Sequence, residues 1–226
     1  WPDAKAIAHF QSHTNTHAPV SRLRALFTEA LAVPGICGLS VATRADCLPP
    51  DVLDLLAELN GKTDLTVELG LQTIHEETAN RIHRCHSYAE FLSAYRALTQ
   101  RGIRVCIHLI NGLPGETEDM MLETASAVGL LRPGGVKIHL LHVLSGTRLA
   151  REWESGAVPM LTREEYIRIV CRQLLRLPPE TVVERLTGDG AKEFLLAPLW
   201  SRDKIAVLGG IDRFLAEHNL CQGCLF

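Results

Sequence analysis

Short stretches in which hydrophobic and polar residues alternate recur along this chain, separated by longer amphipathic stretches. The alternating stretches predict strands at residues 5–11, 35–44, 65–72, 104–110 and 135–144. The amphipathic stretches predict helices at residues 20–32, 49–61, 87–102 and 117–131. Strands and helices that alternate in this way are typical of an α/β fold with a parallel sheet, either barrel-like or doubly wound.

The pattern changes after about residue 145. Three further helices are predicted at residues 147–155, 162–177 and 204–218, with a short strand at residues 181–186. No linker rich in Pro, Gly or Ser separates this part from the preceding one. We therefore expect residues 1–145 to form the main domain, and residues 146–226 to form a C-terminal extension packed on it.

Each predicted strand has one face that carries polar side chains. Successive strands contribute these: His9 and Gln11; Ser40, Ala42 and Arg44; Glu68 and Gln72; Cys106 and His108; Lys137 and His139. A closed barrel of eight strands fills its interior with branched apolar residues, so polar faces indicate a wide or incomplete barrel that holds a polar ligand. Any one of these residues alone could equally be a hydrogen-bonded core residue. Their recurrence on five strands favours a binding site.

Composition narrows the class of protein. Hydrophobic residues make up 46% and charged residues 22% of the 226 residues, as in ordinary globular proteins. The net charge of −3 gives no argument for a DNA or membrane partner. The seven cysteines are irregularly spaced, which favours a reduced, cytoplasmic protein. Cys221 and Cys224 are the one close pair, and we expect them to be two thiols in a solvated tail.

Several motifs together resemble a known family. "ELGLQT", "IHRCHS" and "HLINGLPGE" resemble segments of the radical S-adenosylmethionine (SAM) enzymes, in the branch of the Elp3 catalytic core and the oxygen-independent coproporphyrinogen dehydrogenases. "HFQSHTNTHAP", "SVATRADCLP" and "APLWSRDK" are most similar to the bacterial YhcC/YtqA-type subgroup. The resemblance implies a partial (β/α)6 TIM-like barrel that binds SAM and a 4Fe-4S cluster. It also implies reductive cleavage of SAM to a 5′-deoxyadenosyl radical, hydrogen abstraction from a substrate, and a reductant such as flavodoxin or ferredoxin.

The resemblance also assigns cofactor-binding residues. Gln72 and Arg84 correspond to positions that contact SAM, and His108 to a position that often contacts the ribose. Ile110 and Gly112 lie in the segment beside the adenine.

At Ala42 the superfamily often has an acidic residue that contacts the ribose, and we expect Glu68 to take that role. Gln11, Thr43 and Arg44 complete the expected cofactor-binding set. Lys137, His139 and His142 are the expected substrate-binding residues.

The cysteine spacing departs from the family. Such enzymes hold three irons of the cluster with CxxxCxxC, and this motif does not occur in the chain. The motif "HFQSHTNTHAP" corresponds to the second barrel strand, so we expect the first strand and the cluster cysteines to precede Trp1. The five predicted strands would then be strands 2 to 6, and this chain by itself would be inactive.

Three functions therefore stay open. The first is the SAM- and substrate-binding part of a radical SAM enzyme, whose substrate is a small molecule or, by analogy with the Elp3 core, tRNA. The second is a cluster-less binding or interaction module. The third is a TIM-like hydrolase or isomerase with acid–base or metal groups at Glu68, His108, His139 and His142.

Overall fold

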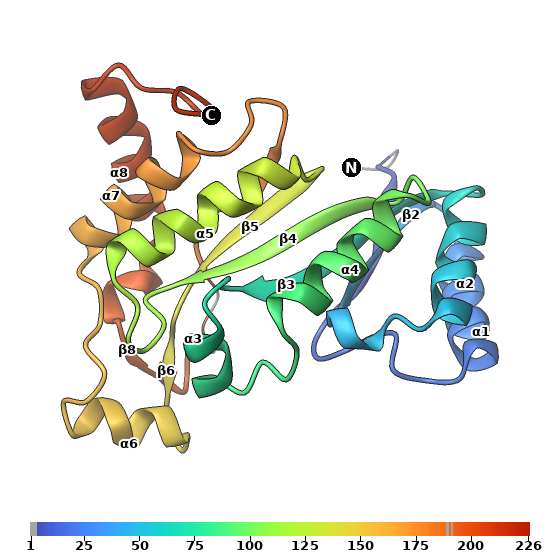
Figure 1. The fold of residues 1–226 in the computed structure, drawn as a ribbon, viewed down its shortest axis with the longest axis horizontal. Coiled ribbons are helices and arrows are strands. Elements are labelled where there is room, and N and C mark those ends of the chain that lie inside the picture. Colours follow the sequence, from blue (N-terminus) through green and yellow to red (C-terminus); the bar gives the residue numbers. More distant parts are fainter. Residues whose placement is uncertain (1–3, 189, 191) are drawn as a thin grey trace. The chain divides into compact units, whose positions relative to one another are not determined.

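A six-stranded sheet is the centre of the fold in the computed structural model, which describes residues 4–188, 190 and 192–226 (Figure 1). Its strands are hydrogen-bonded in the order β1-β2-β3-β4-β5-β7. They span β1 Ala6–Phe10, β2 Ile36–Thr43, β3 Asp64–Gln72, β4 Arg104–Asn111, β5 Gly135–Leu140 and β7 Val182–Arg185. The pairs β1–β2, β2–β3 and β5–β7 are parallel, which confirms the predicted α/β class.

Helices separate the strands along the chain. Their bounds are α1 Val20–Leu31, α2 Pro50–Asn60, α3 Glu76–Arg81, α4 Tyr88–Thr99, α5 Glu118–Leu131, α6 Arg148–Glu154, α7 Arg163–Leu174 and α8 Lys204–Glu217. Two 3-10 helices, η1 Ala45–Cys47 and η2 Leu199–Arg202, are shorter. In the described residues, no helix is both long enough and apolar enough to cross a lipid bilayer.

Local sequence signals explain where most of these helices begin. Ser87 accepts a hydrogen bond from the backbone N–H of Glu90, and the Glu90 carboxylate accepts one from the Ser87 N–H. This reciprocal capping box satisfies two N–H groups at the start of α4. Pro50 begins α2, where its missing N–H costs nothing. The predicted starts of these helices are therefore confirmed.

Two local predictions were wrong. The single strand expected at residues 135–144 is divided into β5 and a two-residue strand, β6 Val143–Leu144, that pairs antiparallel with β8 Leu195–Ala197. The chain has to leave the parallel sheet after Leu140 to make this pairing. Helix α3 was not predicted, because it is only six residues long and has no side-chain cap to mark it.

The chain forms two compact units. Unit 1 comprises residues 1–71 and 86–107, and unit 2 comprises residues 72–85 and 108–226. The division falls within β3 and within β4, so each of these strands contributes to both units. It does not coincide with the expected boundary near residue 145, which stays a prediction.

The core of unit 1 is built on β3. Leu65, Val67, Leu69 and Leu71 alternate along this strand and are each at most 1% exposed. In the same unit, α1 packs against β2 and α2, and α4 packs against η1. The predicted period of two is therefore confirmed for the apolar side chains of this strand.

The core of unit 2 is built around α7. This helix packs against α5 and α8, which lie beside it in Figure 1. Tyr166 of α7 is fully buried, and its hydroxyl donates a hydrogen bond to the Leu186 carbonyl at 2.8 Å. Burial raises the pKa of Tyr166 well above its ordinary value, so the hydroxyl stays a donor.

Candidate functional site

A polar cluster on three neighbouring strands of unit 1 centres on Glu68. This side chain is only 4% exposed, and its Oε1 accepts a hydrogen bond from Ser40 Oγ at 2.6 Å. His9 Nε2 lies 3.0 Å from the same oxygen. The register places His9 opposite Ser40. The three residues predicted to lie on polar faces therefore meet, and the two donors offset the cost of burying the carboxylate.

The predicted residues at the end of β2 are already engaged within unit 1. Thr43 is buried, and its Oγ1 lies 2.5 Å from Thr16 Oγ1. The Arg44 guanidinium donates two hydrogen bonds to Asp46, at 2.9 and 2.5 Å. Burial alone would raise the pKa of Asp46, but the hydrogen bonds and charge of Arg44 outweigh it and lower the pKa. Gln11, just beyond β1, is exposed.

A hollow of about 460 Å³ lies beside Asp46, and sequence reasoning did not find it. It is lined by Thr16, His17, Ala18, Pro19, Asp46, Cys47 and Pro49. Cys47 Sγ lies 4.0 Å from His17 Nδ1. Burial, followed by the nearby charge of Asp46, raises the pKa of Cys47, so its thiol stays protonated and is a poor nucleophile.

In unit 2, Gln72 is the last residue of β3, and Arg84 lies in the segment that follows α3. Gln72 has φ +61°, in the left-handed region that residues other than glycine rarely adopt. Arg84 is 6% exposed, and its guanidinium donates to the Thr73 carbonyl at 2.5 Å. Its other terminal nitrogen lies 3.5 Å from Glu76 Oε2. Arg84 therefore fixes the residue that follows Gln72.

Histidines predicted to bind the cofactor and the substrate lie side by side in unit 2. The rings of His108 and His139 have centroids 5.2 Å apart and are tilted by 44°. Lys137 Nζ lies 3.7 Å from Glu184 Oε2. His142 Nε2 lies 3.1 Å from Ser201 Oγ.

The end of β4 is joined to α7 by a pair of buried amide side chains. Asn111 and Gln173 exchange two amide hydrogen bonds, at 2.8 and 2.9 Å, and each residue is 1% exposed. Gln173 Nε2 also donates to the Met121 carbonyl at 3.1 Å. Beside them, Gly112 has φ +82°, and a Cβ there would lie 3.3 Å from Leu161. The partly buried Ile110 directly precedes Asn111 on β4.

Glu116 is a partly buried acid within the motif "HLINGLPGE", and it was not predicted as a site residue. Burial raises its pKa, against hydrogen bonds from Thr73 and Thr78 that lower it. Its Oε1 is buried and has no hydrogen-bond partner within the part of the chain that the structure describes. No sequence signal marks it, because its hydrogen-bond partners Thr73 and Thr78 lie about forty positions earlier in the chain.

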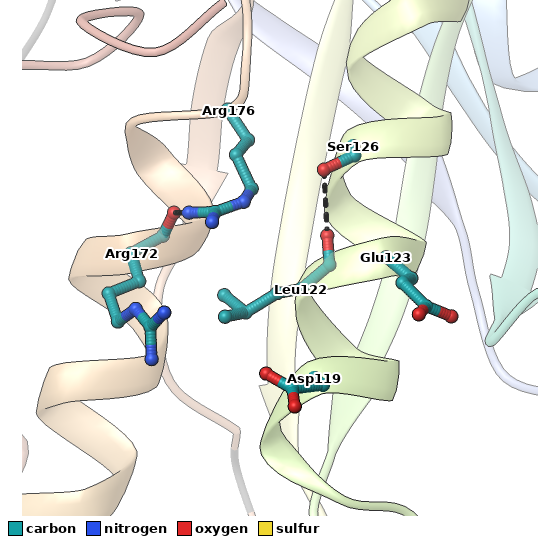
Figure 2. A pocket seen from close by; sticks show the side chains of 6 residues that line it. All are labelled: Asp119, Leu122, Glu123, Ser126, Arg172 and Arg176. Carbon is teal, nitrogen blue, oxygen red and sulfur yellow. Dashed lines mark hydrogen bonds between the residues drawn. The ribbon is translucent and has the colours of Figure 1, made fainter.

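Helices α5 and α7 border a groove of about 440 Å³ in unit 2. Figure 2 shows Arg172 on α7 and Arg176 just beyond its end, with the other lining residues Asp119, Leu122, Glu123 and Ser126 on α5. Arg172 donates to Glu118, and Arg176 donates to the Arg172 carbonyl at 2.7 Å. The bond from Arg172 to Glu118 joins α7 to α5, whereas the bond from Arg176 is local to the end of α7.

No group of three or more His, Cys, Asp and Glu side chains in the described residues is arranged to hold a metal ion.

In sequence, residues 4–128 match the Radical SAM superfamily and residues 133–217 match the Radical_SAM C-terminal domain. YtqA of Bacillus subtilis is 50% identical over 226 residues, which are 100% of this chain and 70% of that protein. YhcC of Escherichia coli is 38% identical over 215 residues, covering 95% of this chain and 70% of that protein.

Among solved structures, the Elp3 of the archaeon Methanocaldococcus infernus, lacking its first 46 residues, is similar with a TM-score of 0.81. The similarity covers 97% of this chain and 56% of that one, at 19% identity. At this identity it shows the fold alone, and it confirms the expected partial-barrel α/β class.

Proposed function

Because the chain belongs to the radical SAM superfamily, we propose that it is the SAM- and substrate-binding part of a radical SAM enzyme. The observation that carries this proposal is the cluster in which His9 and Ser40 contact the buried carboxylate of Glu68. A carboxylate held in place by fixed donors is suited to accept hydrogen bonds from ribose hydroxyls. We assign this role to Glu68, because Ala42 has no group that could perform it.

The chemistry of the chain fits SAM and does not fit an iron–sulfur cluster. A 4Fe-4S cluster that binds SAM needs three thiolates from closely spaced cysteines, and CxxxCxxC is absent from this sequence. SAM needs carboxylate and amide partners and a close backbone approach, which Glu68, Gln72 and Gly112 can supply. We therefore assign binding of SAM and substrate to this chain, and no electron transfer.

Arg84 takes a more specific role in this proposal. Its bond to the Thr73 carbonyl fixes the backbone next to Gln72, whose left-handed conformation has to be maintained by its surroundings. Arg84 then supports SAM binding by positioning the Gln72 amide. Thr43, Arg44, Gln11, His108 and Ile110 remain predicted cofactor contacts.

For the substrate and the reductant, membership of the superfamily supports a proposal of the chemical class only. Lys137, His139 and His142 are proposed to contact the substrate, a small molecule or a tRNA. The net charge of −3 supplies no general attraction for RNA, which favours the small molecule. Flavodoxin or ferredoxin is the proposed reductant of the whole enzyme, and the cytoplasm its compartment.

Titration of SAM into the purified protein by isothermal calorimetry tests the proposal. Glu68→Gln keeps the shape of the side chain and removes its charge, and Gln72→Ala removes the amide. Each variant should bind SAM about tenfold more weakly, since a hydrogen bond to a charged group contributes about 1.5 kcal/mol.

Gln100→Ala, at an exposed position, is the control and should bind SAM like the unchanged protein. Thermal unfolding would establish that all three variants are folded. Unchanged SAM affinity in both site variants would refute the assignment.

A further inference from the structure

The "CQGC" turn at residues 221–224 is fixed to the body of unit 2. Gln222 Nε2 donates to the carbonyls of Pro178 and Thr181, at 2.6 and 2.8 Å. The backbone N–H of Gly223 donates to the Leu174 carbonyl at 3.1 Å. The solvated tail expected from the sequence is therefore a docked turn.

The two sulfur atoms of this turn are in contact. Cys221 Sγ and Cys224 Sγ lie 2.9 Å apart, and both residues are exposed. A disulfide bond is about 2.05 Å long, so less than about 1 Å of movement would join the sulfurs. The geometry is therefore close to that of a disulfide, while both thiols remain accessible to a reagent.

The glycine between them is required for this approach. Gly223 has φ +82°, and a Cβ at this position would lie 2.8 Å from Pro179 Cδ. Any other residue would push the turn away from the loop that holds it.

The two cysteines are chemically different. Cys224 Sγ accepts a hydrogen bond from the Cys221 backbone N–H at 2.9 Å and lies 2.9 Å from Cys221 Sγ, and as a thiol it donates to the Cys221 carbonyl at 2.8 Å. The Cys221 thiol and backbone N–H lower the pKa of Cys224 and favour its thiolate, whereas the bond to Cys224 and its charge raise the pKa of Cys221. Cys224 is suited to attack, and Cys221 to resolve the product.

We propose that Cys221 and Cys224 form a redox-active dithiol that reacts with low-molecular-weight disulfides of the glutathione type. The Cys224 thiolate attacks one sulfur of the disulfide, forms a mixed disulfide with it and releases one thiolate. Cys221 then loses its proton, attacks Cys224 Sγ and releases the second thiolate. The protein loses two electrons and two protons, and one small disulfide becomes two thiols.

Mass spectrometry of the protein after anaerobic reaction with glutathione disulfide at pH 7 tests this proposal. Trypsin cleavage after Arg213 gives a peptide of residues 214–226, which contains both cysteines and no other. In the unchanged protein this peptide should lose the mass of two hydrogens and keep no glutathione. Cys221→Ser should accumulate a stable glutathione adduct on Cys224, and Cys224→Ser should react about tenfold more slowly.

Two further variants make the test selective. Cys37 is also exposed, and Cys37→Ser should leave the reaction of the pair unchanged. Gln222→Ala removes two anchoring bonds and should slow closure of the disulfide several-fold. A peptide that keeps both thiols, or one that keeps a stable adduct in the unchanged protein, would overturn the proposal. Faster reaction at Cys221 than at Cys224 would also overturn it.

Discussion

The amide pair of Asn111 and Gln173 should be a main contributor to the stability of unit 2. Gln173→Leu removes three hydrogen bonds, two to Asn111 and one to the Met121 carbonyl. At about 1 kcal/mol net for each buried bond, the free energy of unfolding should fall by about 3 kcal/mol. Asn111→Leu removes only the two shared bonds and should lower it by about 2 kcal/mol.

The double variant Asn111→Leu/Gln173→Leu measures the energy of the interaction between the two residues, apart from the other effects of each substitution. It loses the same three bonds as Gln173→Leu, so its loss should be about 3 kcal/mol. The sum of the single losses is about 5 kcal/mol, which gives a coupling of about 2 kcal/mol.

Urea unfolding followed by tryptophan fluorescence measures these values, because Trp153 and Trp200 both belong to unit 2. With a slope of about 2 kcal/mol per molar urea, Gln173→Leu should move the midpoint by about 1.5 M. Gln100→Leu, at an exposed position, should stay within about 0.5 kcal/mol of the unchanged protein. Additive losses in the double variant would refute the reasoning.

Three further predictions concern stability. Gly112→Ala should lower the free energy of unfolding by about 1–2 kcal/mol, because φ is +82° there. Gly209→Ala, at an exposed position of α8, should raise the free energy of unfolding by about 0.5–1 kcal/mol. Equal effects of the two substitutions in urea unfolding would contradict this. Thr162→Ala removes the capping box of α7 and should cost about 1 kcal/mol, measured by thermal unfolding, and an unchanged midpoint would argue against the cap. Because burial raises the pKa of Glu116 above its ordinary 4.5, the folded state holds the proton more tightly, and stability should fall as pH rises from 4.5 through the raised pKa. Glu116→Gln should fall less over that pH range in urea titrations, and identical profiles would show that this carboxyl does not titrate as described.

The sequence predicts the polar cluster well because the evidence for it is local. A period of two along each strand assigns Glu68, His9 and Ser40 to polar faces, and parallel neighbouring strands then bring these faces together. The bonds between Asn111 and Gln173 lie beyond such reasoning. Those residues are 62 positions apart, and only the packing of α7 brings them together.

The predictions of a single strand at residues 135–144 and of a solvated tail at residues 221–224 were wrong for a different reason. The split between β5 and β6 depends on pairing with β8, more than fifty residues later in the chain, and its one local sign is the pair of consecutive leucines Leu140 and Leu141. The docking of "CQGC" depends likewise on carbonyl groups between residues 174 and 181, whose availability no pattern of side chains reports.

The cluster around Glu68 has a consequence for how this family of sequences can diverge. His9 and Ser40 donate to one oxygen of a carboxylate that is almost fully buried. Replacing Glu68 by an apolar residue would leave both donors facing a partner that no longer accepts, while replacing either donor would leave a poorly compensated charge. Substitutions at these three positions should therefore be inherited together, and in an alignment of homologues positions 9, 40 and 68 should covary.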